Sequence, residues 1–213
     1  MFNETFPLQV YINLDHRTDR KAQALKEFAD LELNPIRKSG VVIESIDDPY
    51  SRGVIGCLYS HIQILTAANI LGTSVAIFED DVLFLHNDVT PKHILDMACM
   101  ELKDMDWNMI YFGGNLLRPC YQVSPHLAKL THAQSTVAYG VNVKFIPKLL
   151  EYFANITAPI DVIYADKVIP QNSCYITVPM VAIQRDSYSD IEGHDVEYSS
   201  YLEKRYWENL VKA

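Results

Sequence analysis

Residues 74–84 read SVAIFEDDVLF, an apolar run interrupted by three adjacent acids, Glu79, Asp80 and Asp81. The run 75–78 is rich in β-branched and aromatic residues and predicts a short buried strand. The acids therefore stand at the carboxyl end of a core strand, the place where open α/β sheets bind their ligands. Adjacent carboxylates repel one another and are costly to bury unless a cation lies among them. The stretch predicts a cation site at the edge of a sheet.

The chemistry of three carboxylates narrows the kind of site. Carboxylate oxygens are ligands of hard divalent ions such as Mg²⁺ and Mn²⁺, which in turn bind phosphates. The plain alternative is a solvated acidic turn, but the apolar residues on both sides favour a buried site. Phosphoryl-transfer domains, signal-receiver domains and sugar-nucleotide transferases all place acids in this way. A receiver domain would have an aspartate after a later strand, whereas the next predicted strand leads into YFGGN (111–115).

Strands and helices alternate outward from this stretch. Apolar, β-rich runs predict strands at 8–14, 41–46, 75–78, 107–114, 135–143 and 174–184. Helical spacing of apolar residues predicts helices at 15–33, 55–71, 91–102, 145–156, 159–169 and 198–213, with a loop at 47–53. Regular alternation in the first half indicates an α/β fold with a parallel sheet, and the second half is more mixed.

Composition limits the classes of partner. The chain has 213 residues, 49% of them apolar, which suits one domain. A net charge of −9 without a basic cluster argues against nucleic acid and against a basic membrane anchor. No apolar run was expected to span a bilayer, and the first residues do not resemble a signal peptide, so we expect a cytoplasmic protein without a transmembrane segment. The cysteines form no CxxC pair, so we expect reduced thiols and no zinc site: Cys57, Cys99, Cys120 and Cys174.

Five segments occur in the order found in one known family. They are VYINLDHRTDR (10–20), GVIGCLYSHIQIL (53–65), SVAIFEDDV (74–82), AYGVNVKFIPKLLE (138–151) with PID (159–161), and VAIQRDSYSDIEG (181–193). These resemble the NLDRRxDR, GxxGCxxSH, LEDDV, AYxISxxxAxxLL…PVD and Q…SDI motifs of glycosyltransferase family 25. That family includes lipopolysaccharide-type and collagen galactosyltransferases. The resemblance spans about residues 8–193, and His16 departs from it where the family usually has arginine.

The resemblance implies a fold and a reaction. The expected fold is α/β of the GT-A type, with a Rossmann-like nucleotide-binding half and a mixed central sheet. Residues 1–213 would form one domain, with a nucleotide-sugar-binding half at 1–115 and an acceptor-side half at 116–213. The expected reaction is metal-dependent transfer, with Mn²⁺ or Mg²⁺, from a UDP-sugar to a glycan, glycolipid or glycoprotein hydroxyl with inversion.

The same resemblance, read with side-chain chemistry, assigns the site. Asp80, Asp81 and His194 are the expected metal ligands, and Asp161 is the expected general base with Asp166 as its substitute. The expected nucleotide-sugar-binding residues are Asn13, Asp15, Arg17, Arg20, Gly56, Ser60, His61, Glu79, Gly114, Gln184 and Asp190. Further candidates for the sugar pocket and the late loop are Tyr111, Gly113, Asn115 and Ser189.

Each assignment has a structural alternative. Arg17 and Asp161 are also typical of charged residues in a first helical turn. His61 also fits a buried core position, and His194 fits a solvated loop. For the whole chain, the alternatives are a non-catalytic nucleotide-sugar or glycan-binding module and a metal-dependent phosphoryl-transfer domain.

Overall fold

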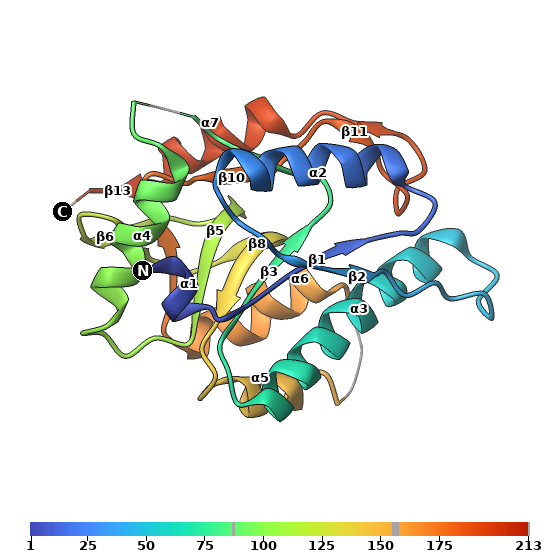
Figure 1. The fold of residues 1–213 in the computed structure, drawn as a ribbon, viewed down its shortest axis with the longest axis horizontal. Helices are drawn as coiled ribbons and strands as arrows, with labels where there is room; N and C mark the ends of the chain where they lie inside the picture. Colours follow the sequence, from blue (N-terminus) through green and yellow to red (C-terminus); the bar gives the residue numbers. More distant parts are fainter. Residues whose placement is uncertain (87, 155–157, 213) are drawn as a thin grey trace.

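The computed structural model describes residues 1–86, 88–154 and 158–212, and within them the chain forms a nine-stranded mixed sheet (Figure 1). In spatial order its strands are β13 (Leu210–Val211), β6 (Cys120–Ser124), β7 (Leu127–Lys129), β9 (Cys174–Thr177), β5 (Met109–Leu116), β8 (Ala133–Val141), β3 (Val75–Glu79), β1 (Leu8–Asn13) and β2 (Ile36–Ser39). β1 pairs in parallel with β2 and β3, whereas β8 is antiparallel to β3 and β5. This mixed sheet confirms the predicted α/β class.

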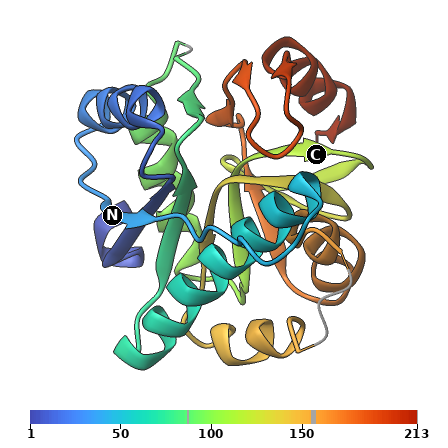
Figure 2. The same cartoon turned by 90° about the vertical axis from the view of Figure 1, so that its right-hand side faces the viewer.

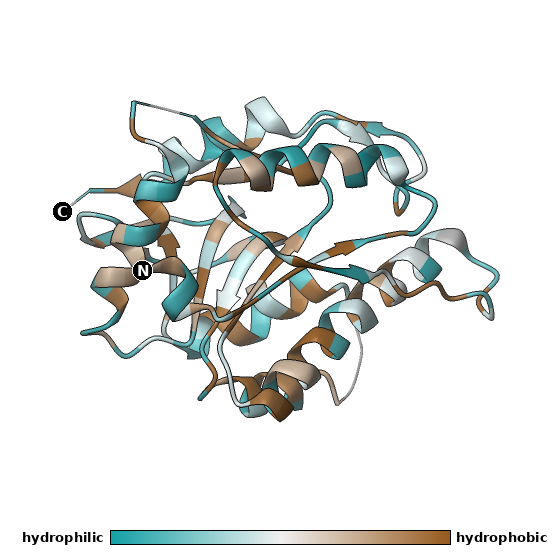
Figure 3. Ribbon diagram, viewed as in Figure 1, coloured by the Kyte–Doolittle hydropathy of each residue, from teal (hydrophilic) through white to brown (hydrophobic). Residues whose placement is uncertain are grey.

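Helices cover both faces of the sheet. On one face α1 (Phe2–Thr5), α2 (Thr18–Asp30) and α4 (Pro91–Leu102) contribute to one apolar cluster. On the other face α3 (Pro49–Leu71), α5 (Ile146–Glu151) and α6 (Ile160–Ile163) contribute to a second cluster. Figure 1 shows α2 above the strands and α3, α5 and α6 below them, and Figure 2 shows the same layers from the side. Hydrophobic residues concentrate along the central strands and the later turns of α3 (Figure 3).

Most of the predicted elements are present. The strands at 8–14, 75–78, 107–114 and 135–143 correspond to β1, β3, β5 and β8. The helix predicted at 91–102 is α4, with Thr90 accepting from the His93 amide as its N-cap. The helix predicted at 145–156 is α5, which ends at Glu151; residues 155–157 lie outside the described residues. The one predicted at 159–169 is α6, continued by a π-helical turn (Tyr164–Val168) and a 3₁₀ turn (Ile169–Gln171). The C-terminal helix is α7 (Ser199–Asn209).

The strand predicted at 41–46 is wrong. The second strand is β2 at Ile36–Ser39, which pairs with β1 up to Asn13. The Gly40 amide then donates to the Asn13 carbonyl, and the chain leaves the sheet. Val41 and Ile43 then lie against α3, where the Val41 amide donates to the Ser60 hydroxyl at 2.8 Å, whereas Val42 is largely exposed. The hydrophobicity of Val41 and Ile43 reflects contact with a helix, which an apolar run alone does not distinguish from strand pairing.

The loop predicted at 47–53 is also wrong, because α3 begins at Pro49. Asp48 is its N-cap, accepting from the Ser51 amide at 2.8 Å, and Gly72 ends it with a φ of 63°. Residues Tyr50–Leu71 are, by length and composition alone, long and apolar enough to cross a membrane, which the sequence analysis did not expect. Core helices pass the same test, and Leu58, Leu65 and Ala68 of α3 are fully buried in this fold.

Residues 174–184 form two strands rather than one. β9 ends at Thr177, and β10 (Ala182–Gln184) pairs instead with β4 (Val82–Phe84). Gly113 and Gly114 lie inside β5, where the register to β8 shifts at Gly113. Short elements that the sequence did not predict complete the fold: α1, β6, β7, β13, and the pair β11 (Ser187–Tyr188) with β12 (Asp195–Val196). β8 lies between β3 and β5, so the sheet is continuous across the predicted boundary at 115–116.

Gly113 allows β10 to approach β5 closely. A Cβ atom there would lie 1.9 Å from the Ala182 carbonyl oxygen, which belongs to the backbone and cannot turn away. We expect Gly113→Ala to lower the free energy of unfolding by about 1–3 kcal/mol, the usual cost of overpacking, as measured by urea denaturation. Gly114→Ala is the matched control, because its nearest contact is the Tyr111 ring at 3.2 Å. Equal losses in the two variants would show that the backbone contact is unimportant.

Candidate active site

The parallel pairing of β1 with β3 brings two strand ends together. Ile12 lies opposite Glu79, so Asn13 and Asp80 are the next residues out of the sheet. The Asn13 amide donates to Asp80 Oδ2 at 2.7 Å and to the Arg17 carbonyl at 3.0 Å. The Asn13 side-chain oxygen accepts from Arg37 Nε at 2.9 Å. Asn13 therefore fastens the acids to the turn after β1.

Arg20, in the first turn of α2, is the cation that the two aspartates share. Its Nη1 lies 3.1 Å from Asp80 Oδ1 and 3.3 Å from Asp81 Oδ2. Its Nη2 donates to the Ser187 hydroxyl and the Tyr188 carbonyl of β11. All three ionic side chains are buried. One guanidinium therefore binds two carboxylates and holds the β11 segment over them.

One buried cation does not balance the acids. Burial raises the pKa of Asp81 to about 7, and the neighbouring charge of Glu79 adds to this effect. Burial likewise raises the pKa of Asp80. Among the described residues, Oδ1 of Asp81 is buried without a hydrogen-bond partner, while Oδ2 accepts from Gln184 at 3.0 Å. An unpartnered carboxylate oxygen beside uncompensated negative charge fits a hard divalent ion such as Mn²⁺ or Mg²⁺.

Glu79 belongs to a second network. Its Oε1 accepts from the Thr136 hydroxyl at 2.5 Å and lies 3.4 Å from His61 Nε2. Burial raises the pKa of Glu79, but its contacts with His61 and Thr136 outweigh this effect and hold that pKa below its ordinary value. His61 is fully buried and its Nδ1 lies 2.8 Å from the Tyr139 hydroxyl. Glu79 is therefore ionised, and its hydrogen bond goes to Thr136 rather than to Arg20.

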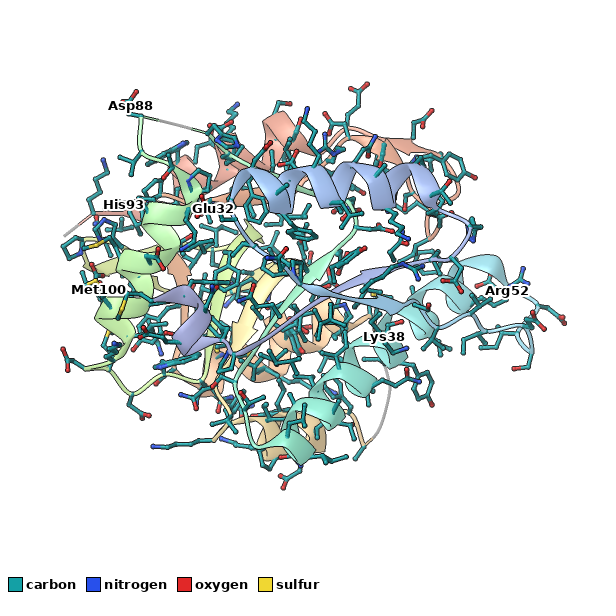
Figure 4. The ribbon with its side chains drawn as sticks, viewed as in Figure 1. Glu32, Lys38, Arg52, Asp88, His93 and Met100 are labelled. Carbon is teal, nitrogen blue, oxygen red and sulfur yellow. The ribbon has the colours of Figure 1, made fainter. Side chains whose placement is uncertain are left out.

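Two cavities meet at Glu79. The first has a volume of about 370 Å³ and the second about 540 Å³. Both are lined by Cys57, Glu79, Gln184, Ser189 and Ile191. The predicted site residues that line the first cavity are Asn13, Arg20, Gly56, Ser60, His61, Glu79, Asp80, Asp81, Gln184 and Asp190. Arg52, labelled in the first turn of α3 in Figure 4, also lines it.

Asp161 lies on the second cavity, as the first residue after the start of α6. Its carboxylate accepts from the Val162 amide at 2.8 Å and the Ser135 amide at 3.3 Å. Burial raises the pKa of Asp161, and Glu79 contributes a smaller part. A half-buried carboxylate with a raised pKa, fixed by backbone donors beside a cavity, is suited to accept a proton. Asn115, a candidate for the sugar pocket, lines the same cavity.

Other predicted residues have structural partners. The Ser60 hydroxyl donates to the Gly56 carbonyl while accepting from Val41, and a Cβ at Gly56 would lie 2.4 Å from the Val41 carbonyl. These two residues seat the 41–43 segment on α3. Arg17 forms ion pairs with Asp19 and Asp190, which fasten the late loop to the start of α2. Direct contact of any of these with a nucleotide stays a prediction.

A few predicted residues lie away from the cavities. Within the described part of the chain, neither cavity is lined by Asp15, Gly114, His194 or Asp166. Asp15 is exposed and bonds to Arg37, and the Gly114 amide faces Met180. His194 is exposed, 3.3 Å from Glu192, so the structure does not bring it to Asp80 and Asp81. Asp166 pairs with His132.

Sequence reasoning missed several wall residues. Thr136 precedes the quoted AYGV motif by two positions, and nothing in its local pattern marks it. Val41, Val42 and Ile43 were expected in a strand but form an apolar wall of the first cavity. Cys57 is predicted only as a reduced thiol, although its place one helical turn before His61 puts both on one face of a helix. That spacing was the available signal.

The raised pKa of Asp81 predicts that ionised Asp81 destabilises the folded protein at neutral pH. The folded protein keeps a proton on Asp81 that the unfolded chain loses above about pH 4. Proton binding by Asp81 therefore stabilises the fold at low pH, and this stabilisation is lost as pH rises towards 7. We expect Asp81→Asn to raise Tm at pH 8 in a chelating buffer, by the equivalent of about 1 kcal/mol or more, and to lose this advantage towards pH 4.

Asp96→Asn is the control, because the pKa shift of Asp96 has the opposite sign to that of Asp81. Although burial raises the pKa of Asp96, its bonds to Lys92 and to the Phe2 amide bring that pKa below its ordinary value. This variant is expected to lose stability at pH 8. If Asp81→Asn were also less stable than the wild type at pH 8, the ionised form of Asp81 would be a net stabilising group.

The chain is similar to several solved structures at 7–11% sequence identity. Among solved structures, a glycosyltransferase involved in the glycosylation of the major capsid of PBCV-1 is similar over 94% of this chain and 97% of its own, at 11% identity and a TM-score of 0.46. UDP-glucose pyrophosphorylase complexed with UDP-glucose is similar over 94% and 80%, at 10% identity and a TM-score of 0.45. A197 from STIV covers 84% and 95%, at 7% identity and a TM-score of 0.41.

A comparison with curated proteins found no significant match. The family model described as "Glycosyltransferase family 25 (LPS biosynthesis protein)" matches residues 38–164, more than half of the chain. That range contains the acids at the end of β3, the α3 motif and Asp161. The chain belongs to glycosyltransferase family 25, and the protein is a glycosyltransferase.

Proposed function

We propose that this glycosyltransferase moves a sugar from a UDP-sugar to a hydroxyl of a glycan, glycolipid or glycoprotein, with inversion at the transferred carbon. The observation that carries the proposal is the pair of cavities joined at Glu79 and Gln184. The first cavity has the aspartates Asp80 and Asp81 at its wall, and the second has Asp161. A transferase needs a donor site and an acceptor site that meet at the reacting carbon.

The first cavity suits a nucleoside diphosphate. It lies at the carboxyl ends of the parallel strands β1 and β3, where α/β sheets bind nucleotides. Val41, Val42 and Ile43 offer an apolar wall for a base or ribose. Arg52 and His16 lie on its lining and supply donors for phosphate oxygens. Few cations face this cavity, so the charge of a diphosphate calls for a further positive charge.

Asp80 and Asp81 would hold that charge as Mn²⁺ or Mg²⁺, because Oδ1 of Asp81 has no other partner among the described residues. When bound, the ion supplies Lewis-acid neutralisation of the departing diphosphate. Arg20 shares the aspartates' charge from the protein side, and Gln184 orients Asp81 by donating to Oδ2. The protein therefore presents Asp81 with one oxygen bonded and one oxygen free.

The second cavity suits a sugar acceptor. Tyr50 and Tyr198 offer ring faces, and Asn115 and Gln134 offer amide groups for hydroxyls. Asp161 accepts the proton of the incoming hydroxyl as its oxygen forms a bond to the anomeric carbon of the donor. The bond from that carbon to the diphosphate breaks, and its electron pair leaves with the diphosphate oxygen. Attack from the face opposite the leaving group inverts the configuration.

Titration with UDP tests the donor site. We expect UDP to bind in the presence of Mn²⁺ and to lose at least tenfold in affinity without it. Asp81→Asn is expected to abolish the effect of Mn²⁺ while remaining folded, because it removes the free carboxylate oxygen. Asp104→Asn, an exposed acid with the same charge change, is the control and should bind as the wild type. Isothermal titration calorimetry measures all three; equal UDP affinity with and without metal would contradict the donor proposal.

Turnover tests the acceptor site. We expect Asp161→Asn to lower kcat by about 10²–10⁴-fold, the usual contribution of a general base, with UDP affinity unchanged. Wild-type kcat/KM should fall as pH drops through the raised pKa of Asp161, because the base must be ionised. The control is Asp166→Asn, since Asp166 pairs with His132 and lines neither cavity among the described residues. Full turnover in Asp161→Asn would exclude Asp161 as the base.

A further inference from the structure

Three potential metal ligands of different chemistry meet in the wall between the cavities. Cys57 and His61 stand one turn apart on the same face of α3, and Glu79 ends β3. The Cys57 sulfur, one His61 ring nitrogen and one Glu79 carboxylate oxygen all lie within 4.8 Å of one another. Cys57 and Glu79 line both cavities, and His61 lines the first. The group is therefore reachable from the same space as a ligand.

His61 supplies a second, independent observation. Its ring is fully buried, and Nδ1 is bonded to the Tyr139 hydroxyl, which also contacts the Tyr164 hydroxyl at 3.3 Å. In the described part of the chain, Nε2 has no hydrogen-bond partner, although Glu79 Oε1 is 3.4 Å away. When Nδ1 carries the hydrogen and donates it to Tyr139, Nε2 has a lone pair that can bind a cation. A bound cation would then replace the present contact between His61 and Glu79, and a histidine fixed through its other nitrogen is the usual arrangement of a metal ligand.

We propose that Cys57, His61 and Glu79 form a site for a thiophilic divalent ion, Zn²⁺, separate from the oxygen site of Asp80 and Asp81. Three protein ligands of sulfur, nitrogen and oxygen leave a fourth position open, as in zinc sites that bind water or substrate. Thiolate and imidazole select zinc, whereas a set of carboxylates suits Mn²⁺ or Mg²⁺. Two neighbouring sites of different softness therefore bind different ions.

Charge and proton balance support this assignment. On binding, the S–H bond of Cys57 breaks, a bond from sulfur to zinc forms, and one proton passes to the solvent. The Cys57 thiolate and the Glu79 carboxylate then match the two positive charges of the ion, and His61 stays neutral. Zinc bonds of about 2.0–2.3 Å require the three ligand atoms to draw together from their present separation. Cys57 and Glu79 both line the cavities, and the proposal requires their side chains to turn towards His61.

The site was not expected from the sequence, because the chain has no CxxC pair. It uses a Cys-x₃-His pair on a helix and takes its third ligand from a strand that follows. Zinc in this wall lies where the donor and acceptor cavities join. The proposal concerns binding by the protein alone and does not depend on the proposed UDP-sugar transfer.

Cobalt titration tests the site directly, because Co²⁺ replaces Zn²⁺ and absorbs strongly in the near ultraviolet when a thiolate binds it. We expect one equivalent of Co²⁺ to give this absorption in the full chain, and one equivalent of Zn²⁺ to abolish it. Cys57→Ser and His61→Gln should each weaken zinc binding by more than about 100-fold, and Tyr139→Phe, an outer partner, by about 10–100-fold.

Matched variants separate this site from other metal binding. Cys99→Ser removes a buried thiol in the apolar cluster on the opposite face of the sheet and should keep the cobalt absorption. Asp81→Asn disables the oxygen site and should keep it as well. Absorption that survives in Cys57→Ser, or that never develops with one equivalent of Co²⁺, overturns the proposal. Loss of UDP binding in Asp81→Asn with cobalt absorption intact would separate the two metals.

A measurement on the unaltered protein guards against misfolded variants. We expect Zn²⁺, but not Mn²⁺, to protect Cys57 from alkylation by iodoacetamide at least tenfold, as measured by peptide mass spectrometry. Cys99, Cys120 and Cys174 are fully buried and serve as internal references for general unfolding. Equal alkylation of Cys57 with and without zinc overturns the proposal, whatever the variants show.

Discussion

The candidate site depends on the buried ion pairs of the Arg20 guanidinium with Asp80 and Asp81. The guanidinium reaches Asp80 and Asp81 at the end of β3 and, with its other nitrogen, Ser187 and the Tyr188 carbonyl in β11. Truncating one member of a buried ionic cluster leaves the others uncompensated, which typically costs about 3–5 kcal/mol. Arg20 therefore fixes helix α2, the end of β3 and the β11 segment relative to one another.

The excess of negative charge distinguishes this arrangement from an ordinary structural ion pair. One cation faces two aspartates, and Asp81 is held with a raised pKa and a buried free oxygen. A stable core would pair or replace such a group. Glu79, one residue earlier, has its own partners in Thr136 and His61, and its charge contributes to the raised pKa of Asp81. Glu79 and the two aspartates therefore belong to two separate networks of partners at the end of β3.

Glu79 also defines how the two cavities communicate. It lines both, together with Cys57 from α3 and Gln184 from β10, so residues from three separate segments form the common wall. Gln184 in this wall donates to Asp81 and so connects the wall to the aspartates. Glu79 lies beside His61 and connects it to the second network. A change in the charge of this wall therefore alters the electrostatic potential in both cavities, since electrostatic interactions are strong where water is excluded.

Much of this was readable from residue order. The strand at 75–78, the acids after it and the helix at 91–102 followed from the spacing of apolar residues. The strand predicted at 41–46 failed because an apolar run against a helix has the same composition as one in a sheet. The single strand at 174–184 failed because β10 pairs with β4 rather than continuing β9, and pairing partners are distant in sequence.

The sequence by itself determined the class of fold, the family and the identity of the acids, because these depend on local pattern and on motifs in order. Only the tertiary structure decided which residues share a cavity. It separated Asp161 from Asp166, left His194 in solvent, and placed Cys57, His61 and Glu79 within reach of one ion. The physical reason is that side-chain neighbours across a sheet and its covering helices are set by strand pairing and packing over the whole chain. No local run of residues contains that information.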